Sequence, residues 1–589
     1  MTSTPLYAPL QHQDTIRLIR LKPRNDENGI EVILKSFRLS SAIKFNALSY
    51  VWGSPTPQRW ISCNGHQVSI TPNLHSALSQ LLQQGFDCLL WVDALCINQQ
   101  DDEEKSAQVA MMRGIFSRAA KVIFWLGEEQ DFDKDGARLM NTFFQKHPEL
   151  LFTGELRDKS LRELGMPYFD TGWVGWASLL IRPWFGRVWI AQEFSSAKES
   201  VFMSGAVEIP TKVLMHCAIA TNVCVEIQNV FAIQTESGLS AATLRQRPLH
   251  LCITQDNEYF VRKEDIDIDD IWKRSHLLEA TDERDRVFAL LSLQTMLPMD
   301  LIDYSKDIVE VYTEVAKIAL THPIALEQPV HSKVSSQPSR ISLGNKTYRS
   351  SRFLACKCYS LSESQLPSWV PDWRPNGIRF APLTDYYLGI SFFDHPYQDA
   401  IIENRTMSIS GVFVDKPSVI VDSMPYMEDV LSNVRREERN PLQVSHKWGE
   451  ECSMSQASIA GGILPHDEYI GGFQALRKRM LQTTQQDDRH RAVFEGSESS
   501  NRRYFEYESR FAELSQGRKF CVTETGKLAW IPQAAKPGDE ICFLAGCAVP
   551  FVIRRAGDSW RLLGDCYLDG LMSDVSMTFL PQPQLLKFT

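Results

Sequence analysis

The segment Leu90–Glu104 reads LWVDALCINQQDDEE and joins two kinds of structure. Its beginning belongs to the apolar run Cys88–Leu95, which is typical of a strand buried in a parallel sheet. Its last four residues are acidic and open a helix, because carboxylates are favoured at the positive end of the helix dipole. Apolar residues recur at helical spacing over Val109–Ala119, and Lys121–Leu126 is a second buried strand stopped by Gly127.

The residues before this segment continue the same alternation. Asn46–Val51 is a short apolar strand, and Trp60–Ile70 is a hairpin with Asn64-Gly65 as its turn. Thr71–Gln83 has leucines on one face and is therefore predicted to be a helix. Strand, helix, strand, helix, strand predicts an α/β domain with a parallel sheet. Trp184–Ala197 is predicted to be a further helix.

A chain of 589 residues is too long for one hydrophobic core. We predict an α/β domain over residues 1–205, with an insertion at about 130–180, and a helical region over 206–325. A mixed region with flexible loops follows over 326–514, because residues 326–352 are rich in Ser, Pro and Gln and residues 430–510 are polar. Short β-rich segments separated by glycines predict a small antiparallel β module over 515–589.

Composition excludes several classes of function. The formal net charge is −10 with no basic block, which argues against nucleic-acid binding. No apolar run reaches the roughly 18 residues of a membrane span, and the start lacks a secretion signal, so we expect a cytoplasmic protein. The 13 cysteines form no paired CxxC pattern, so they are predicted to be free thiols in a reducing compartment, with no zinc site. No cofactor is predicted.

Three blocks of this sequence resemble the fungal heterokaryon-incompatibility (HET) domain. They are ALSYVWG at Ala47–Gly53, the stretch from Leu90–Glu104 to VIFWLG at Val122–Gly127, and RPWFGRVWIAQE at Arg182–Glu193. Later stretches also resemble proteins of this family, among them TDERDRVFALLSL at Thr281–Leu293. The resemblance implies an effector of non-self recognition and programmed cell death, activated by a protein trigger that the sequence does not identify.

HET domains are distant relatives of Toll/interleukin-receptor (TIR) domains, so the resemblance also implies a TIR- or flavodoxin-like sheet. Some TIR domains cleave NAD with a helical Glu that follows a Trp by four residues. Trp189 and Glu193 have this spacing, which places both on one helix face. A long insertion separates the VIFWLG strand from this helix, unlike in a typical TIR domain. The resemblance thus identifies Glu193 as the catalytic candidate and NAD as a possible substrate.

Ligands of open parallel sheets bind beyond the carboxyl ends of the strands, and Trp52, Gly53 and Asp93 occupy such positions. We predict that they bind substrate. Gly53 either allows close approach of a ligand or forms a left-handed turn. Asp93, inside an apolar run, either binds ribose hydroxyls or caps a neighbouring loop. No GxGxxG is present, so Rossmann-type binding of a dinucleotide is not predicted.

Glu104, Arg187 and Trp189 complete the predicted substrate-binding set, and each has a structural alternative. Glu104 suits an acidic first helical turn without any ligand. Arg187 either meets phosphates or pairs with Glu193 on a helix surface. Trp189 either stacks on a base or belongs to the core. Two functions therefore remain open, an NAD-cleaving effector and a non-enzymatic module that signals by self-association.

Overall fold

The structure is a computed structural model of the chain. It describes residues 5–23, 29–148, 156, 159–234, 278–291, 299–321, 359–360, 365–374, 377–378, 400–421, 517–545, 547, 549–569, 571 and 581–589. The chain forms two compact units, and the division falls between Val311 and Tyr312. The Ser-, Pro- and Gln-rich stretch at 326–352 and the polar stretch at 430–510 lie outside the described residues.

The first unit is built on one nine-stranded sheet with the strand order β5-β4-β2-β1-β6-β3-β7-β8-β9. The strands β6, β3, β7 and β8 run parallel at its centre, whereas β1 and β9 pair antiparallel on either side of them. The α/β prediction is confirmed in this mixed form. The strands are β1 (Thr15–Pro23), β2 (Ile30–Arg38), β3 (Asn46–Tyr50), β4 (Arg59–Cys63), β5 (His66–Ile70), β6 (Leu90–Trp91), β7 (Val122–Gly127), β8 (Ser200–Ser204) and β9 (Val207–Pro210).

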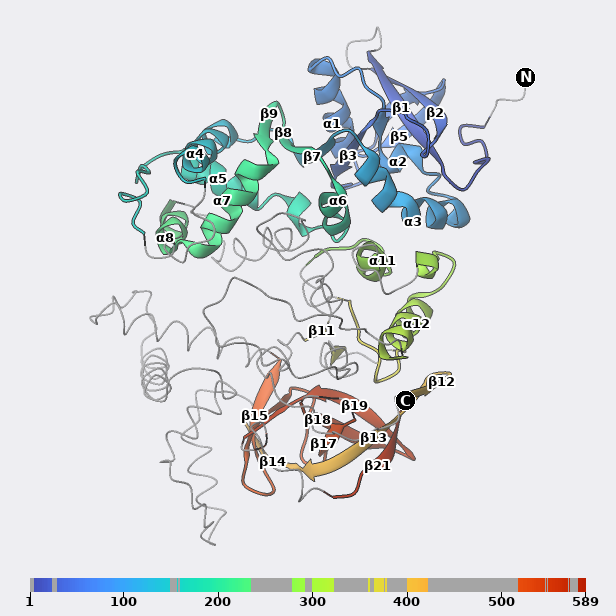
Figure 1. Cartoon of the computed structure of the whole chain (residues 1–589), viewed down its shortest axis with the longest axis vertical. Coiled ribbons are helices and arrows are strands. Elements are labelled where there is room, and N and C mark those ends of the chain that lie inside the picture. Colours follow the sequence, from blue (N-terminus) through green and yellow to red (C-terminus); the bar gives the residue numbers. More distant parts are fainter. Residues whose placement is uncertain are drawn as a thin grey trace. The chain divides into compact units, whose positions relative to one another are not determined.

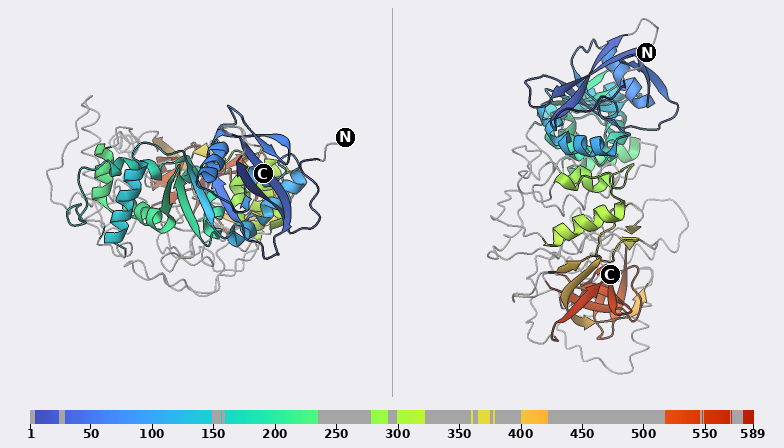
Figure 2. Two further views of the ribbon diagram at one scale, coloured as in Figure 1. Left: turned by 90° about the horizontal axis from the view of Figure 1, so that it is seen from above. Right: turned by 90° about the vertical axis from the view of Figure 1, so that its right-hand side faces the viewer.

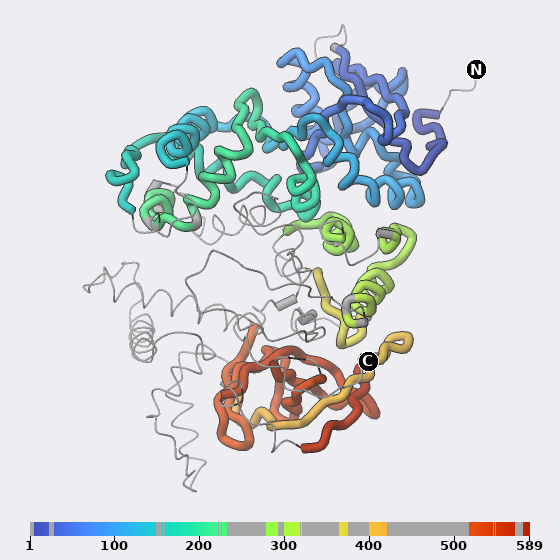
Figure 3. The backbone as a smooth tube through the Cα atoms, viewed as in Figure 1, coloured from blue at the N-terminus to red at the C-terminus, as the bar shows by residue number. Residues whose placement is uncertain are grey.

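Helices surround the sheet and gather beyond its β8–β9 end (Figures 1 and 2). Those in the sheet region are α1 (Pro72–Gln83), α2 (Asp93–Cys96), α3 (Asp102–Arg118) and α6 (Ile190–Ser196). The remaining helices of this unit are α4 (Asp133–Lys146), α5 (Gly172–Leu180), α7 (Thr211–Val223), α8 (Val225–Gln234) and α11 (Asp285–Leu291). Figure 3 traces the chain from β7 out through α4 and α5 and back to α6.

The local sequence signals that predicted the hairpin and the helices are visible in the structure. Asn64 and Gly65 both have positive φ angles, 50° and 83°, as the tight turn between β4 and β5 requires. Thr71 caps α1 by accepting a hydrogen bond from the Leu74 amide. Asp101 caps α3 in the same way, and three further acids fill its first turn, so the predicted acidic helix start is confirmed.

Two predicted elements differ from the observed ones. The strand predicted over Cys88–Leu95 is shorter, because β6 ends at Trp91 and α2 begins at Asp93, whose carboxylate accepts a hydrogen bond from the Ala94 amide. The helix predicted over Trp184–Ala197 is interrupted. A 3₁₀ turn over Pro183–Gly186 precedes α6, and Arg187 between them is extended.

The hairpin of β1 and β2 was not predicted from the sequence. Its nine-residue ladder runs from Thr15 opposite Arg38 to Pro23 opposite Ile30. Apolar side chains of both strands are fully buried, including Ile16, Leu18 and Val32. The hairpin therefore completes the core on one side of the parallel strands.

The inserted helices α4 and α5 cross where both have glycine. A Cβ atom on Gly175 would overlap the Phe132 carbonyl oxygen and lie 2.8 Å from the Gly136 amide nitrogen. A Cβ atom on Gly136 would lie 2.6 Å from the Trp176 amide nitrogen. The two backbones thus approach more closely than any side chain allows.

Gly175→Ala is expected to destabilise the first unit by at least about 2 kcal/mol, because the methyl group meets backbone atoms that cannot rotate away. Gly114→Ala in α3 is the matched control. Its Cβ would find its nearest neighbours at 3.5 and 3.6 Å, so it should stabilise α3 by up to about 1 kcal/mol through helix propensity. Hydrogen exchange of peptides from α4 and α5 measures the local loss. Unchanged exchange in the folded variant would contradict the close crossing.

A buried ion pair joins the start of α4 to the central sheet. Arg182 and Asp133 have side chains that are 5% and 0% exposed, and the guanidinium donates directly to the carboxylate. The same Asp133 oxygen accepts a hydrogen bond from Ser204 at the end of β8, at 2.7 Å. Arg182 also donates to the Glu128 carbonyl oxygen after β7. The pair therefore fixes the insertion against two parallel strands.

The second unit carries the predicted antiparallel β module at the C-terminus. Strands from residues 401–421 join it, which was not predicted. One sheet has the order β12-β13-β17-β18-β19-β21 and the other β14-β15-β16-β20. The strands are β12 (Ile401–Glu403), β13 (Thr406–Asp415), β14 (Pro417–Val421), β15 (Arg518–Thr523), β16 (Leu528–Pro532), β17 (Glu540–Leu544), β18 (Phe551–Ala556), β19 (Ser559–Asp565), β20 (Tyr567–Leu568) and β21 (Gln584–Phe588).

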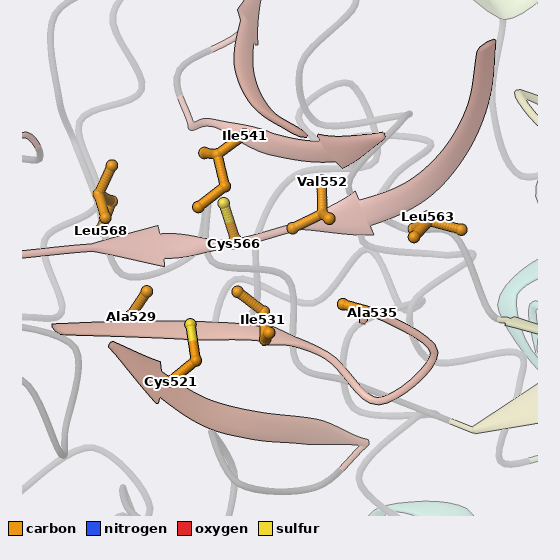
Figure 4. Close-up of a cluster of buried hydrophobic side chains, with 9 residues drawn as sticks. All are labelled: Cys521, Ala529, Ile531, Ala535, Ile541, Val552, Leu563, Cys566 and Leu568. Atoms are coloured by element: carbon orange, nitrogen blue, oxygen red, sulfur yellow. The ribbon is translucent and has the colours of Figure 1, made fainter. Parts of the chain in front are cut away.

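Apolar side chains from both of these sheets meet in one core cluster, shown in Figure 4. Ile531 comes from β16, and Ile541 and Val552 come from β17 and β18. Two free cysteines, Cys521 and Cys566, are fully buried in the same cluster. Burial raises the pKa of both thiols, so they are unreactive.

Candidate functional site

The candidate site lies where the parallel strands β6 and β3 end. Ser49 and Tyr50 are the last residues of β3, and Asp93 follows the end of β6 by two residues. The segment Arg187–Glu193 follows the insertion in the sequence and lies at the same edge, because Arg187 donates a hydrogen bond to the Tyr50 carbonyl oxygen. This edge is the one at which open parallel sheets bind their ligands.

Glu193 lies on α6 and is 2% exposed. Its Oε2 atom accepts a hydrogen bond from the Ser49 hydroxyl, which in turn accepts one from Trp184 Nε1 at 2.8 Å. The Oε1 atom lies 3.9 Å from Arg187 Nη1. The predicted alternative, a pair of Arg187 with Glu193, is therefore present, but Glu193 is buried and Arg187 partly buried instead of both lying on a helix surface.

Burial raises the pKa of the Glu193 carboxyl, and the negative charge of Asp93 raises it further. Arg187 and the Ser49 hydroxyl act in the opposite direction. An aromatic cluster packs beside Glu193, with the Phe124 ring 4.9 Å from that of Trp184 and 5.5 Å from that of Phe194. A buried carboxyl with a perturbed pKa and defined partners is typical of a functional site.

Asp93 shares this environment. Its Oδ2 atom accepts a hydrogen bond from Trp52 Nε1 at 2.7 Å, and Trp52 is 37% exposed. Burial raises the pKa of the Tyr50 hydroxyl well above its ordinary value, and the charge of Asp93 adds to this effect. Asp93 also accepts a hydrogen bond from the Ala94 amide at 2.7 Å. This bond lies within the start of α2, so ribose binding and the capping of a neighbouring loop both stay predictions for Asp93.

Gly53 forms a left-handed turn directly after Trp52, the residue that donates to Asp93. Its φ angle is +71°, which favours glycine, and the nearest atom to an added Cβ would be Asn73 Cβ at 3.8 Å. Asn73 holds the chain here by donating to the Val51 carbonyl oxygen and accepting from Trp125 Nε1 at 3.0 Å. The turn interpretation of Gly53 therefore fits the backbone.

Glu104 and Trp189 have other neighbours. Glu104 pairs with Arg17 of β1 through two hydrogen bonds of 2.6 and 2.9 Å and accepts a third from the Asn98 amide. Trp189 is 8% exposed, and its Nε1 atom donates to Asp285 at 2.9 Å. The structure thus brings together Trp52, Gly53, Asp93, Arg187 and Glu193 and places the other two side chains in supporting networks.

Sequence reasoning did not identify Ser49 or Tyr50 as site residues. Ser49 is a hydroxyl in the apolar strand Asn46–Tyr50 and is 1% exposed. A polar residue inside a buried strand needs a hydrogen-bonding partner, and this was the one signal available. The partner, Glu193, lies 144 positions later in the chain, so nothing local indicated it.

No metal ligand set is present within the part of the chain that the structure describes, where no three His, Cys, Asp or Glu side chains come together. The helices in these same residues include none long and apolar enough to cross a membrane.

Comparison with known proteins identifies the domains. Residues 45–193 match the family model described as heterokaryon incompatibility protein (HET), and residues 465–579 match the Het-6 beta-barrel domain. The chain is 24% identical to heterokaryon incompatibility protein 6, OR allele, of Neurospora crassa, over 97% of this chain and 95% of the relative. No solved structure matches. The prediction of a HET-domain protein is therefore confirmed.

Proposed function

We propose that this HET-domain protein is a heterokaryon-incompatibility effector that cleaves NAD at the nicotinamide–ribose bond after a protein trigger activates it. The observation that carries the proposal is the convergence of Glu193, Asp93 and Arg187 at the carboxyl edge of the parallel strands. The similarity to an incompatibility protein along nearly the whole chain supports the biological role.

The chemistry suits these three side chains. When the N-glycosidic bond breaks, its electron pair leaves with neutral nicotinamide, and positive charge develops on the ribose. The Glu193 carboxylate stabilises that charge, and water then adds to the ribose carbon to give ADP-ribose and a proton. Asp93 binds the ribose hydroxyls, and Arg187 binds a phosphate. Trp52 is partly exposed and donates a hydrogen bond to Asp93, so its ring offers a face on which a base of NAD can stack.

The TIR- or flavodoxin-like arrangement is part of the same proposal. The four parallel strands β6, β3, β7 and β8 form a continuous block with the candidate site at one end, which supports it. The burial of Glu193 means that substrate reaches the carboxylate only after the surrounding side chains move. A requirement for opening suits a protein that stays inactive until it meets its trigger.

One observation favours a second function, a self-associating signalling module without enzymatic activity. Glu193 already has two partners, Ser49 and Arg187, and is buried among them. A carboxylate in that position also serves to fix α6 in the fold, and no substrate is then required. Both functions predict growth arrest on overexpression, so a biochemical assay must separate them.

The test is NAD turnover by the full-length protein. The chain is incubated with NAD at protein concentrations raised until the copies self-associate, which here takes the place of the protein trigger. Light scattering follows self-association, and chromatography separates the products. Release of nicotinamide and ADP-ribose in equal amounts is the expected result. A folded, self-associated chain that leaves NAD intact would contradict cleavage and favour the signalling module.

The pH dependence of turnover follows from the raised pKa of Glu193. The reaction needs the ionised carboxylate, and burial shifts its protonation to a higher pH than for an ordinary glutamate. The rate should therefore fall on acidification at a pH above the usual glutamate range. A profile of kcat/KM from pH 4 to 8 measures this, provided hydrogen exchange shows the chain folded throughout. An acidic limb at the ordinary glutamate pKa would contradict the assignment.

A further inference from the structure

The stretch Thr281–Leu293 stands out in the sequence, yet the site described above does not use it. Its helix α11 (Asp285–Leu291) packs against α6, which carries Glu193, and lies below it in Figure 1. We call the described residues 278–291 and 299–306 the brace. The brace contacts the chain around Arg187–Glu193 at two points and α3 at a third.

The first contact is a backbone bridge beside Arg187. The Glu279 amide donates to the Gly186 carbonyl oxygen, and the Val188 amide donates to the Glu279 carbonyl oxygen at 3.0 Å. Arg286, 2% exposed, supports this bridge by donating to the Leu278 carbonyl oxygen at 2.8 Å. The bridge holds Arg187 extended, in the conformation from which it reaches the Tyr50 carbonyl oxygen.

The second contact is the carboxylate of Asp285. Its Oδ2 atom accepts a hydrogen bond from Trp189 Nε1 at 2.9 Å, and its Oδ1 atom accepts one from the Tyr304 hydroxyl at 2.6 Å. Trp189 is the cap residue of α6, and its carbonyl oxygen accepts the hydrogen bond of the Glu193 amide. A displacement of Trp189 is therefore transmitted to Glu193 within one helical turn.

The third contact ties the brace to α3. The Tyr304 amide donates to the Ser106 hydroxyl at 3.0 Å, and Lys105 Nζ lies 3.7 Å from the centre of the Tyr304 ring. Tyr304 is thus fixed from two sides, by α3 and by Asp285. Since α3 packs against α6 as well, the brace closes a ring of contacts around the helix that carries Glu193.

We propose that Asp285, held by Tyr304, is a positioning residue that fixes α6 and so places the Glu193 carboxylate. The brace then belongs to the working unit although it lies beyond residues 45–193, the part that matches the HET family model. The placement of α6 is independent of the reaction, and only the consequence for catalysis rests on the proposed function. A fragment that ends near residue 205 lacks the brace entirely.

The experiment compares Asp285→Asn with Asp303→Asn in the full-length protein. Asparagine at 285 retains one oxygen and turns an N–H group towards one of the two donors, so one hydrogen bond is lost. Asp303 is the matched control, because it lies in the same brace and its carboxylate accepts from Ser305 at an exposed position. Tyr304→Phe is a second variant that removes only the hydroxyl group from the network.

Hydrogen exchange of peptides covering 187–196 is the deciding measurement. Asp285→Asn should speed this exchange about tenfold, the factor of one lost hydrogen bond, and Tyr304→Phe should do so to a smaller extent. Asp303→Asn should leave the exchange unchanged, as should peptides of α1 and α4 in all three variants. If the folded Asp285→Asn variant exchanged residues 187–196 at the wild-type rate, the proposal would be overturned. An equal increase of the exchange rate in every helix and strand of the first unit would overturn it too.

NAD turnover of the same variants separates this inference from the proposed function. If the wild type releases nicotinamide, Asp285→Asn should lower kcat about tenfold or more and leave KM within about twofold, since positioning acts on the reacting carboxylate. An equal rise in KM with unchanged kcat would overturn the catalytic consequence. If the self-associated wild type releases no nicotinamide while exchange of 187–196 still increases in Asp285→Asn, cleavage is wrong and the positioning of α6 by Asp285 stands.

Discussion

Glu193→Gln is expected to lower nicotinamide release by the full-length protein at least about a hundredfold, the usual scale for one preorganised electrostatic group. Glutamine has the shape of the protonated side chain and still accepts the hydrogen bond from Ser49. Because burial already favours the neutral carboxyl, the variant should fold as well as the wild type. The measurement is the initial rate of nicotinamide release at saturating NAD.

Glu199→Gln is the matched control for this experiment. Glu199 follows α6 by three residues and is exposed, so its neutralisation should not change turnover. Equal loss in both variants would indicate a general effect of charge on the fold. Turnover that survives Glu193→Gln would retain the enzyme and reject Glu193 as its catalytic residue.

Asp133→Ala is expected to cause the largest loss of stability, about 3–5 kcal/mol in the first unit. The substitution leaves the Arg182 guanidinium buried without its counter-charge, and the Ser204 hydroxyl loses its acceptor as well. Hydrogen exchange of peptides from α4 and β8 reports the local loss without requiring the two units to unfold together.

The matched control is Asp135→Ala, two positions along the same helix. Asp135 also has a cationic neighbour, Arg138, but both side chains are largely exposed, and such pairs contribute at most about 1 kcal/mol. A loss at Asp133 no greater than the loss at Asp135 would contradict the assignment of the Arg182–Asp133 pair as an essential contact.

Where the sequence predicted structure well, the determinants were local. The turn at Asn64-Gly65, the acidic helix start at Asp101 and the strand predicted over Lys121–Leu126, observed as Val122–Gly127, each depend on neighbours within a few positions. The strand predicted over Cys88–Leu95 was wrong at its end for a local reason too. The Asp93 carboxylate accepts a hydrogen bond from the Ala94 amide at the start of α2, and this local bond competes with a strand conformation.

The sequence predicted some of the residues at this edge but neither all of them nor their contacts. The ends of the strands in an open sheet predicted Asp93 and Trp52 at one edge, where both lie. The resemblance to TIR domains identified Glu193. The roles of Glu104 and Ser49 depend on partners from distant strands, because Arg17 lies in the unpredicted strand β1 and Glu193 lies beyond the insertion. No short-range pattern encodes such pairs, so the sequence left both interpretations of Glu104 open.

The ring of contacts around α6 has a consequence for synthesis of the protein. Ser49 lies near the beginning of the chain, whereas Asp285 and Tyr304 lie near its middle. A ribosome adds roughly 5–20 residues per second, so on the order of 10 to 50 seconds separate the emergence of the first and last of these residues. A nascent chain, or one released early by a premature stop codon, therefore carries the HET signature blocks before the carboxylate at 193 can be held in place.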